Sequence, residues 1–169
     1  MEQTTIRPAR ESDLQALTSL YNHYVRETPI TFDLRPFSVD ERRAWFARFG
    51  ETGRHRLQVS ETAAGVNGFA SSGGFRPKAA YDTTVETTLY LAPEATGVGL
   101  GTRLYAALFE SLESEDVRLA VAGITLPNPA SIALHERFGF EPVGIFRQVG
   151  YKFERYWDVQ WVQKELGGS

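Results

Sequence analysis

Three glycines stand at alternate positions, Gly97, Gly99 and Gly101, between a segment typical of a strand and a segment typical of a helix. Residues 85–91 read VETTLYL, and their side chains alternate as they do along a half-buried strand. Residues 102–114 carry leucine and tyrosine at helical spacing. Glycines lack a Cβ, so backbone N–H groups can converge at the positive start of a helix. The pattern predicts an α/β fold with a candidate phosphate site at this turn.

Two common phosphate-binding motifs fit this loop poorly. A P-loop needs Gly-Lys-Ser/Thr, but Gly101 is followed directly by Thr102. A dinucleotide fingerprint needs a glycine three residues after its second glycine, and here Thr102 stands three residues after Gly99. It also needs an acid after the next strand, whereas Asp116 precedes that strand. A cradle for another phosphate and a plain glycine-rich loop both remain open.

The rest of the chain predicts a mixed sheet flanked by helices on both faces. A capping box begins at Ser38, and the helix near the N-terminus places Tyr21 and Tyr24 on its apolar face. Strands are expected at residues 4–7, 55–60, 66–75, 85–91, 118–126, 143–148 and 156–162. Helices are expected at residues 11–26, from 38 onward, at 102–114 and from 129 to 138.

Composition excludes several classes of function. The chain has 169 residues, which suits one domain, expected over residues 1–166 with a short tail at 167–169. Its net charge of -3 gives no sign of a nucleic-acid partner. The absence of cysteine excludes disulfides, thiolate metal sites and a cysteine nucleophile. Because no run reaches the length of a membrane span, we expect a cytoplasmic protein without a membrane or metal partner.

Two ionisable residues are candidates for proton transfer. Glu86 is the only charged residue in its predicted strand and directly precedes the glycine loop, so it is either a base or one partner of a surface salt bridge. His135 lies four residues after Ser131, on the same side of a short helix. It is either a solvent-facing residue or a proton-transfer group.

Three stretches taken together resemble a known superfamily. VETTLYLAPEATGVGLGTRLY, LPNPASIALHERFGF and GYKFERYWDVQWVQ, in this order, look like the GCN5-related N-acetyltransferases (GNAT). Within them, the match is closest to the phosphinothricin and methionine sulfoximine acetyltransferases, and it covers nearly the whole chain. The resemblance implies a GNAT fold, with a central mixed, mostly antiparallel twisted sheet of about six to seven strands and about four helices.

The resemblance also implies that the glycine loop holds the pyrophosphate of acetyl-CoA through backbone amides. The usual pattern begins with Gln or Arg, where this chain has Thr96. Because backbone amides do most of the binding, we expect this departure to weaken the affinity for CoA at most. Asn128 is either a turn residue or a contact for the pantetheine arm. The residues implied in cofactor binding are Leu89, Tyr90, Leu91, Thr96, Gly97, Val98, Gly99, Gly101, Thr102, Asn128 and Ser131.

In the same resemblance, Glu86 matches the proposed general base. His135 stands where relatives carry the general acid for the thiolate, and a role for His135 as the base stays open. The candidate acceptor residues are Phe32, which matches a pocket region, and the stretch with Phe75, Arg76, Lys78 and Tyr81. A cation in that stretch is suited to bind the carboxylate of a substrate. The alternative is that the stretch is a surface loop rich in basic residues.

We therefore expect an acetyl-CoA-dependent N-acetyltransferase for a small amino acid or analogue such as phosphinothricin, methionine sulfoximine or methionine sulfone. Without a cysteine, direct attack in a ternary complex is favoured. Two alternatives remain: an acetyltransferase for protein N-termini and a non-catalytic acyl-CoA sensor. The resemblance also implies a homodimer.

Overall fold

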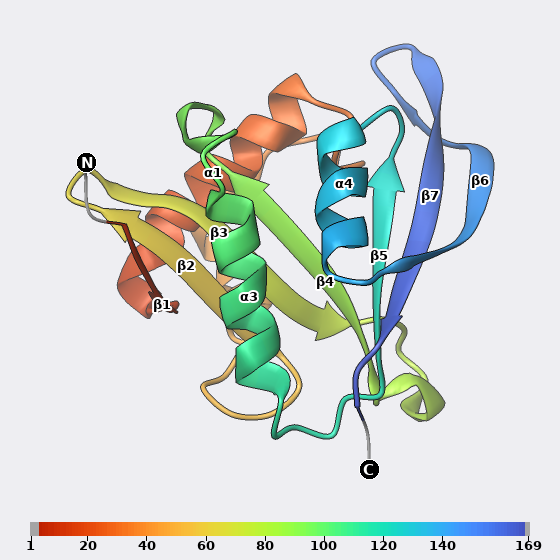
Figure 1. Cartoon of the computed structure of the whole chain (residues 1–169). Helices are drawn as coiled ribbons and strands as arrows, with labels where there is room; N and C mark the ends of the chain where they lie inside the picture. Colours follow the sequence, from red (N-terminus) through yellow and green to blue (C-terminus); the bar gives the residue numbers. More distant parts are fainter. Residues whose placement is uncertain (1–3, 168–169) are drawn as a thin grey trace.

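A computed structural model describes residues 4–167 and shows one seven-stranded sheet in the order β1-β2-β3-β4-β5-β7-β6 (Figure 1). The strands are β1 Thr5–Pro8, β2 Arg56–Thr62, β3 Gly65–Gly74, β4 Thr84–Leu91, β5 Leu119–Thr125, β6 Glu141–Lys152 and β7 Arg155–Glu165. The helices are α1 Leu14–Glu27, α2 Val39–Phe46, α3 Leu100–Leu112 and α4 Pro129–Arg137. Within the described residues, β4 and β5 are the only strands that pair in parallel. The predicted mixed, mostly antiparallel sheet with flanking helices is confirmed.

The sheet buries an apolar core on each face. Helices α3 and α4 lie in front of the sheet in Figure 1 and α1 lies behind it. Strand β4 serves both cores because its side chains alternate: Val85 and Leu89 pack on the side of α3, and Tyr90 packs on the side of α1. The alternation of β4 therefore sends Glu86 to the same face as Tyr90, away from α3.

The pairing of β4 with β5 is short, and this opens the sheet. Only three residue pairs form, from Thr84↔Leu119 to Glu86↔Val121. Beyond Glu86 the two strands diverge, as Figure 1 shows, and β4 runs on to the glycine loop. The second half of β4 therefore has a free edge toward β5, and Glu86 stands where the opening begins.

Several predicted boundaries shift. The predicted first helix is a 3-10 turn, Glu11–Asp13, followed by α1, and the capping box of Ser38 with Glu41 is confirmed before α2. Helix α3 begins at Leu100, two residues earlier than predicted, directly after Gly99, its N-cap, which has a left-handed conformation that glycine adopts readily.

Strands β6 and β7 are longer than the predicted 143–148 and 156–162. Nearly every residue of β6 is exposed, so no apolar alternation marks its length. The turn between the strands places Phe153 and Glu154 at positive φ, without the glycine or asparagine that usually signals such a hairpin.

Of the predicted tail, Gly167 follows β7 without regular structure, and residues 168 and 169 lie outside the described range. Within residues 4–167, each helix is too short or too polar to cross a bilayer.

Candidate active site

A cavity of about 650 Å³ lies at the opening between β4 and β5. We call it the Glu86 cavity. Most of the residues predicted for the cofactor and for catalysis line it, together with Phe32. These residues are Glu86, Leu89, Tyr90, Leu91, Thr96, Gly97, Gly99, Gly101, Thr102, Asn128, Ser131 and His135. Val98 is the exception, since it does not line the cavity and its side chain is 72% exposed.

The glycine loop forms one end of this cavity. Gly97 and Gly99 have φ angles of +76° and +77°, which a residue with a Cβ adopts only with strain. Gly99 is the N-cap of α3, and no side chain caps the helix. The first backbone N–H groups of α3 are therefore available for an anion.

Thr96 stands where the resemblance implies a longer polar side chain, and its own side chain is turned to the loop. Its hydroxyl donates to the Pro93 carbonyl at 2.9 Å, within the turn Pro93–Ala95. The side chain thus supports the loop locally. Arg137 reaches the loop from α4 and donates to the Thr102 hydroxyl at 3.1 Å, which brings a cation to the start of α3.

The free edge of β4 forms the floor of the opening. The Leu91 carbonyl accepts a hydrogen bond from the Tyr24 hydroxyl at 2.6 Å, and the Ala92 N–H donates to the Asn67 carbonyl at 2.8 Å. The first bond holds the end of β4 from α1, and the second holds it from the neighbouring strand β3. Leu89 and Tyr90 lie on the part of the strand that β5 leaves unpaired.

Glu86 faces the cavity as a half-buried carboxylate. Burial raises the pKa of the Glu86 carboxyl above its ordinary value, and the positive charge of Arg76 partly offsets this. Among residues 4–167 no cation lies within 4.0 Å of the Glu86 carboxylate, so its interpretation as half of a salt bridge is wrong. A desolvated carboxylate with a raised pKa is a stronger base than one on the surface.

His135 is 5% exposed, which rules out the solvent-facing interpretation. Its Nδ1 lies 2.7 Å from the Ser131 carbonyl, so Nδ1 carries the proton and donates. Burial lowers the pKa of His135, which favours the neutral ring. In a neutral ring with Nδ1–H, the Nε2 atom accepts, and the Tyr105 hydroxyl lies 2.9 Å from it. That hydroxyl is also 3.2 Å from Thr87 Oγ1, so His135 connects α4 to α3 and β4.

Asn128 caps α4. Its Oδ1 accepts from the Ser131 backbone N–H at 3.1 Å, and Pro129 fills the first helical position. Its role as a cap is thus shown, and its side chain lies at the wall of the cavity.

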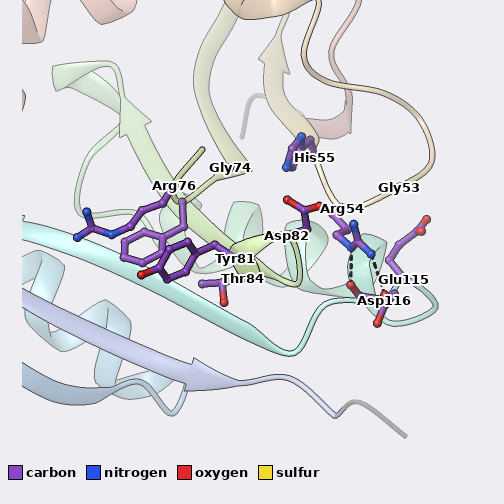
Figure 2. Close-up of a pocket in the computed structure, with 11 residues that line it drawn as sticks. Gly53, Arg54, His55, Gly74, Arg76, Tyr81, Asp82, Thr84, Glu115 and Asp116 are labelled. Atoms are coloured by element: carbon purple, nitrogen blue, oxygen red, sulfur yellow. Dashed lines mark hydrogen bonds and ion pairs between the residues drawn. The ribbon is translucent and has the colours of Figure 1, made fainter. Parts of the chain in front are cut away.

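The predicted acceptor residues fall in two places. Phe32 lines the Glu86 cavity, whereas Phe75, Arg76 and Tyr81 line a second cavity of about 560 Å³ (Figure 2). Figure 2 shows Arg76 and Tyr81 at one end of it and Arg54, paired with Asp116 at 2.7 Å, at the other. Lys78 lines neither cavity. The positive charge of Arg76 still offsets part of the rise in the pKa of Glu86.

Sequence reasoning assigned Tyr21 and Tyr24 to the core and missed that both line the Glu86 cavity. The signal was present, because a buried tyrosine hydroxyl needs a partner, and two tyrosines on one apolar helical face indicate a polar site nearby. Thr31 and Tyr105 also line the cavity and carried no comparable signal.

Comparison with known proteins agrees with this geometry. A family model described as an acetyltransferase (GNAT) domain matches residues 6–161. A phosphinothricin N-acetyltransferase from Streptomyces coelicolor is 54% identical over 163 residues, which cover 95% of each chain. An L-methionine sulfoximine/L-methionine sulfone acetyltransferase from Pseudomonas aeruginosa is 37% identical, over 96% of this chain and 94% of that one.

A solved structure supports the same assignment. The GNAT superfamily phosphinothricin acetyltransferase from Sinorhizobium meliloti, in complex with acetyl-CoA, superposes with a TM-score of 0.91 at 33% identity. The match covers 97% of this chain and 89% of that chain. The strand, glycine loop and capped short helix that frame the Glu86 cavity are thus those of a known family, and the chain belongs to the GNAT acetyltransferases.

Proposed function

We propose that this protein transfers the acetyl group of acetyl-CoA to the amine of a small amino acid or analogue of the phosphinothricin or methionine sulfone type. One observation carries the proposal: an unpaired, desolvated carboxylate, Glu86, lies in a cavity with a glycine loop at one end and Phe32 on its wall. The acceptor class follows the names of the relatives from Streptomyces coelicolor and Pseudomonas aeruginosa.

Each part of the cavity has a role in this proposal. The N–H groups at Gly97, Gly99 and the start of α3 bind the pyrophosphate, and the free edge of β4 pairs with the pantetheine arm. The acceptor enters from the side of α1 and the segment around Phe32. The amine nitrogen attacks the thioester carbon, the C–N bond forms and the C–S bond breaks. Glu86 takes the amine proton directly or through one water, and the sulfur leaves as thiolate and is protonated from solvent.

Of the two candidate bases, the geometry favours Glu86. Both ring nitrogens of His135 are engaged, one by the Ser131 carbonyl and the other by the Tyr105 hydroxyl. We propose that His135 acts as a positioning residue that holds Tyr105 and α4 at the wall of the cavity. Its replacement is therefore expected to lower the rate much less than replacement of Glu86.

A small acceptor fits better than a protein N-terminus. The acceptor side is closed by packed aromatic residues, with Tyr21 against Tyr90 at 5.4 Å and Tyr24 against Tyr90 at 4.9 Å between ring centroids. A sensor without catalysis would not need the ionisable Glu86 at the cost of desolvating it. Because the reaction consumes acetyl-CoA, we place it in the cytoplasm.

We further propose a homodimer that buries the outer surface of the β6–β7 hairpin. Seven large apolar or aromatic side chains of the hairpin are between 42% and 59% exposed: Val143, Ile145, Phe146, Val149, Tyr151, Phe153 and Tyr156. A patch of this kind marks an interaction surface. Light scattering on the purified protein should give twice the chain mass, and a Phe146→Lys variant should lower it. A monomer at all concentrations contradicts the dimer.

The test of the proposed function is the release of free thiol from acetyl-CoA with a panel of amines. The panel contains phosphinothricin, methionine sulfoximine, methionine sulfone and a short peptide. We expect turnover on at least one of the amino-acid analogues and less on the peptide. Binding of acetyl-CoA without turnover on any amine would favour the sensor, and failure to bind acetyl-CoA would overturn the proposal.

A further inference from the structure

Residues 30–33, the Phe32 segment, form the acceptor-side wall of the Glu86 cavity. Ile30, Thr31 and Phe32 all line that cavity. On its α1 side, the segment is tied by Tyr21, whose hydroxyl lies 2.7 Å from Thr31 Oγ1 and also donates to the Asp33 carboxylate. The segment carries no regular structure of its own, so what holds its other side decides where Phe32 lies.

The other side is held by Lys152 at the end of β6. The Lys152 ammonium donates to the Thr31 carbonyl at 2.7 Å, and the residue is only 5% exposed. Burial lowers the pKa of Lys152, and the nearby Asp33 charge partly offsets this. The backbone of Lys152 is itself fixed, because the Trp157 indole N–H donates to its carbonyl at 2.8 Å. The Lys152 ammonium also lies 5.2 Å from the centroid of the neighbouring Phe153 ring. Burying a lysine to hold a backbone carbonyl carries a desolvation penalty, which indicates that the position of the loop matters.

Gly150, two residues before Lys152, lies directly against the ring of Phe32. A Cβ added at Gly150 would lie 2.2 Å from Cε2 and 2.3 Å from Cζ of Phe32. The backbone of Gly150 is not left-handed, so glycine is needed there for space and not for conformation. Phe32 lines the cavity and Gly150 does not, so a ring displaced from Gly150 moves toward the space in which an acceptor would lie.

We propose that Gly150 and Lys152 are positioning residues for the acceptor: through Phe32 and Thr31 they set how long an acceptor side chain the Glu86 cavity accepts. This inference rests on the proposed function. Strand β6 thereby controls specificity for the acceptor, although neither Gly150 nor Lys152 lines the cavity. It predicts that changes at Gly150 and Lys152 act on the acceptor and leave acetyl-CoA unaffected.

The test compares Gly150→Ala with Gly144→Ala, which makes the same change in the same strand. A Cβ at Gly144 meets no atom within 4 Å, so this control keeps the composition and removes only the clash. Two acceptors are used, methionine sulfone and its analogue shortened by one methylene, S-methylcysteine sulfone. For Gly150→Ala we expect kcat/KM for methionine sulfone to fall about ten-fold, the effect of a packing change of this size. The kcat/KM for the shorter acceptor should fall less, and the KM for acetyl-CoA should change less than about two-fold.

Lys152→Met keeps the apolar stem and removes the bond to Thr31, and should shift the same acceptor ratio in the same direction by about three-fold. Crystal structures of the two glycine variants supply a readout that does not depend on turnover. Phe32 should move in Gly150→Ala and stay in place in Gly144→Ala.

Three results would overturn the inference. The first is a Phe32 ring that does not move in Gly150→Ala. The others are an unchanged ratio of kcat/KM between the two acceptors although the ring has moved, and equal losses of kcat/KM for acetyl-CoA and for the acceptor. If the unmodified enzyme turns over none of the amines, the proposed function fails, and with it the acceptor role given to Gly150 and Lys152. The ring position in the variants separates that result from a failure of the packing argument alone.

Discussion

The two sides of the Glu86 cavity are built in different ways. The cofactor side is continuous in sequence: β4 runs into the glycine loop and then into α3. The acceptor side is assembled from distant parts of the chain, since the Lys152–Thr31 bond joins residues 121 positions apart. A local motif fixes the first side by backbone geometry, whereas the second depends on the packing of an irregular segment against a strand.

This difference has a functional consequence. Backbone N–H groups at a helix start bind any pyrophosphate of the right shape, so one loop serves a whole family with a common cofactor. In our proposal, the acceptor side changes through residues such as Gly150, which do not line the cavity, so that specificity varies while the chemistry at Glu86 is kept. The two sides should therefore respond separately to mutation.

The largest effect is expected at the point where the two sides meet. Glu86→Gln keeps the shape of the side chain and removes the base. We expect kcat/KM for the acceptor to fall by about 10²- to 10⁴-fold at pH 7.5, with little change in the affinity for acetyl-CoA. Steady-state rates and calorimetric binding of acetyl-CoA measure the two quantities. A loss below about five-fold would mean that the base is elsewhere.

On the cofactor side, Gly99→Ala should raise the KM for acetyl-CoA about five- to ten-fold and leave the acceptor KM unchanged. The cause is the left-handed conformation of Gly99, which costs an alanine about 1–2 kcal/mol and disturbs the N–H groups at the start of α3. Gly65→Ala is the matched control, because Gly65 also has a positive φ and lies in the β2–β3 turn away from the cavity. If both variants change the KM for acetyl-CoA equally, the loop has no special role.

His135→Gln tests the hydrogen bonds that His135 makes with Ser131 and Tyr105. The quantity to follow is the pH dependence of the free energy of unfolding. The folded-state pKa of His135 is lowered, so the unmodified protein has the full contribution of the neutral ring above about pH 6.5 and loses it as the pH falls through the folded pKa. The variant lacks this group and should show a smaller loss of stability between pH 8 and pH 5. Urea unfolding at the two pH values provides the measurement. An equal loss of stability between pH 8 and pH 5 in the variant and the unmodified protein would contradict a buried, neutral His135 ring.

The smallest expected effect is a gain of stability in Glu86→Gln. The raised pKa of Glu86 means that its ionised form opposes folding at neutral pH, and this cost disappears as the pH falls and the carboxyl is protonated. The variant should melt about 2 °C higher than the unmodified protein at pH 8, and the gap should narrow at pH 5. A variant that melts lower at pH 8 would show that the charge is stabilised in the fold.

The sequence predicted the cofactor side more completely than the acceptor side. The period of β4 and the position of Gly97 and Gly99 are local features, and the structure brings them to one cavity. The position of Phe32 was expected only from resemblance, and Gly150 and Lys152 carried no signal, because their role exists only once β6 packs against residues 30–33. Phe75, Arg76 and Tyr81 were expected beside the acceptor, and the turn after β3 directs them to a second cavity.

The most direct test is a crystal structure with coenzyme A and methionine sulfone bound together. We expect the pyrophosphate to lie at Gly97 and Gly99, and the acceptor amine to face the Glu86 carboxylate, directly or through one water, with the acceptor side chain against Phe32. An acceptor bound instead in the second cavity, between Arg76 and Tyr81, would contradict the assignment of the Phe32 wall and of Glu86 as the base.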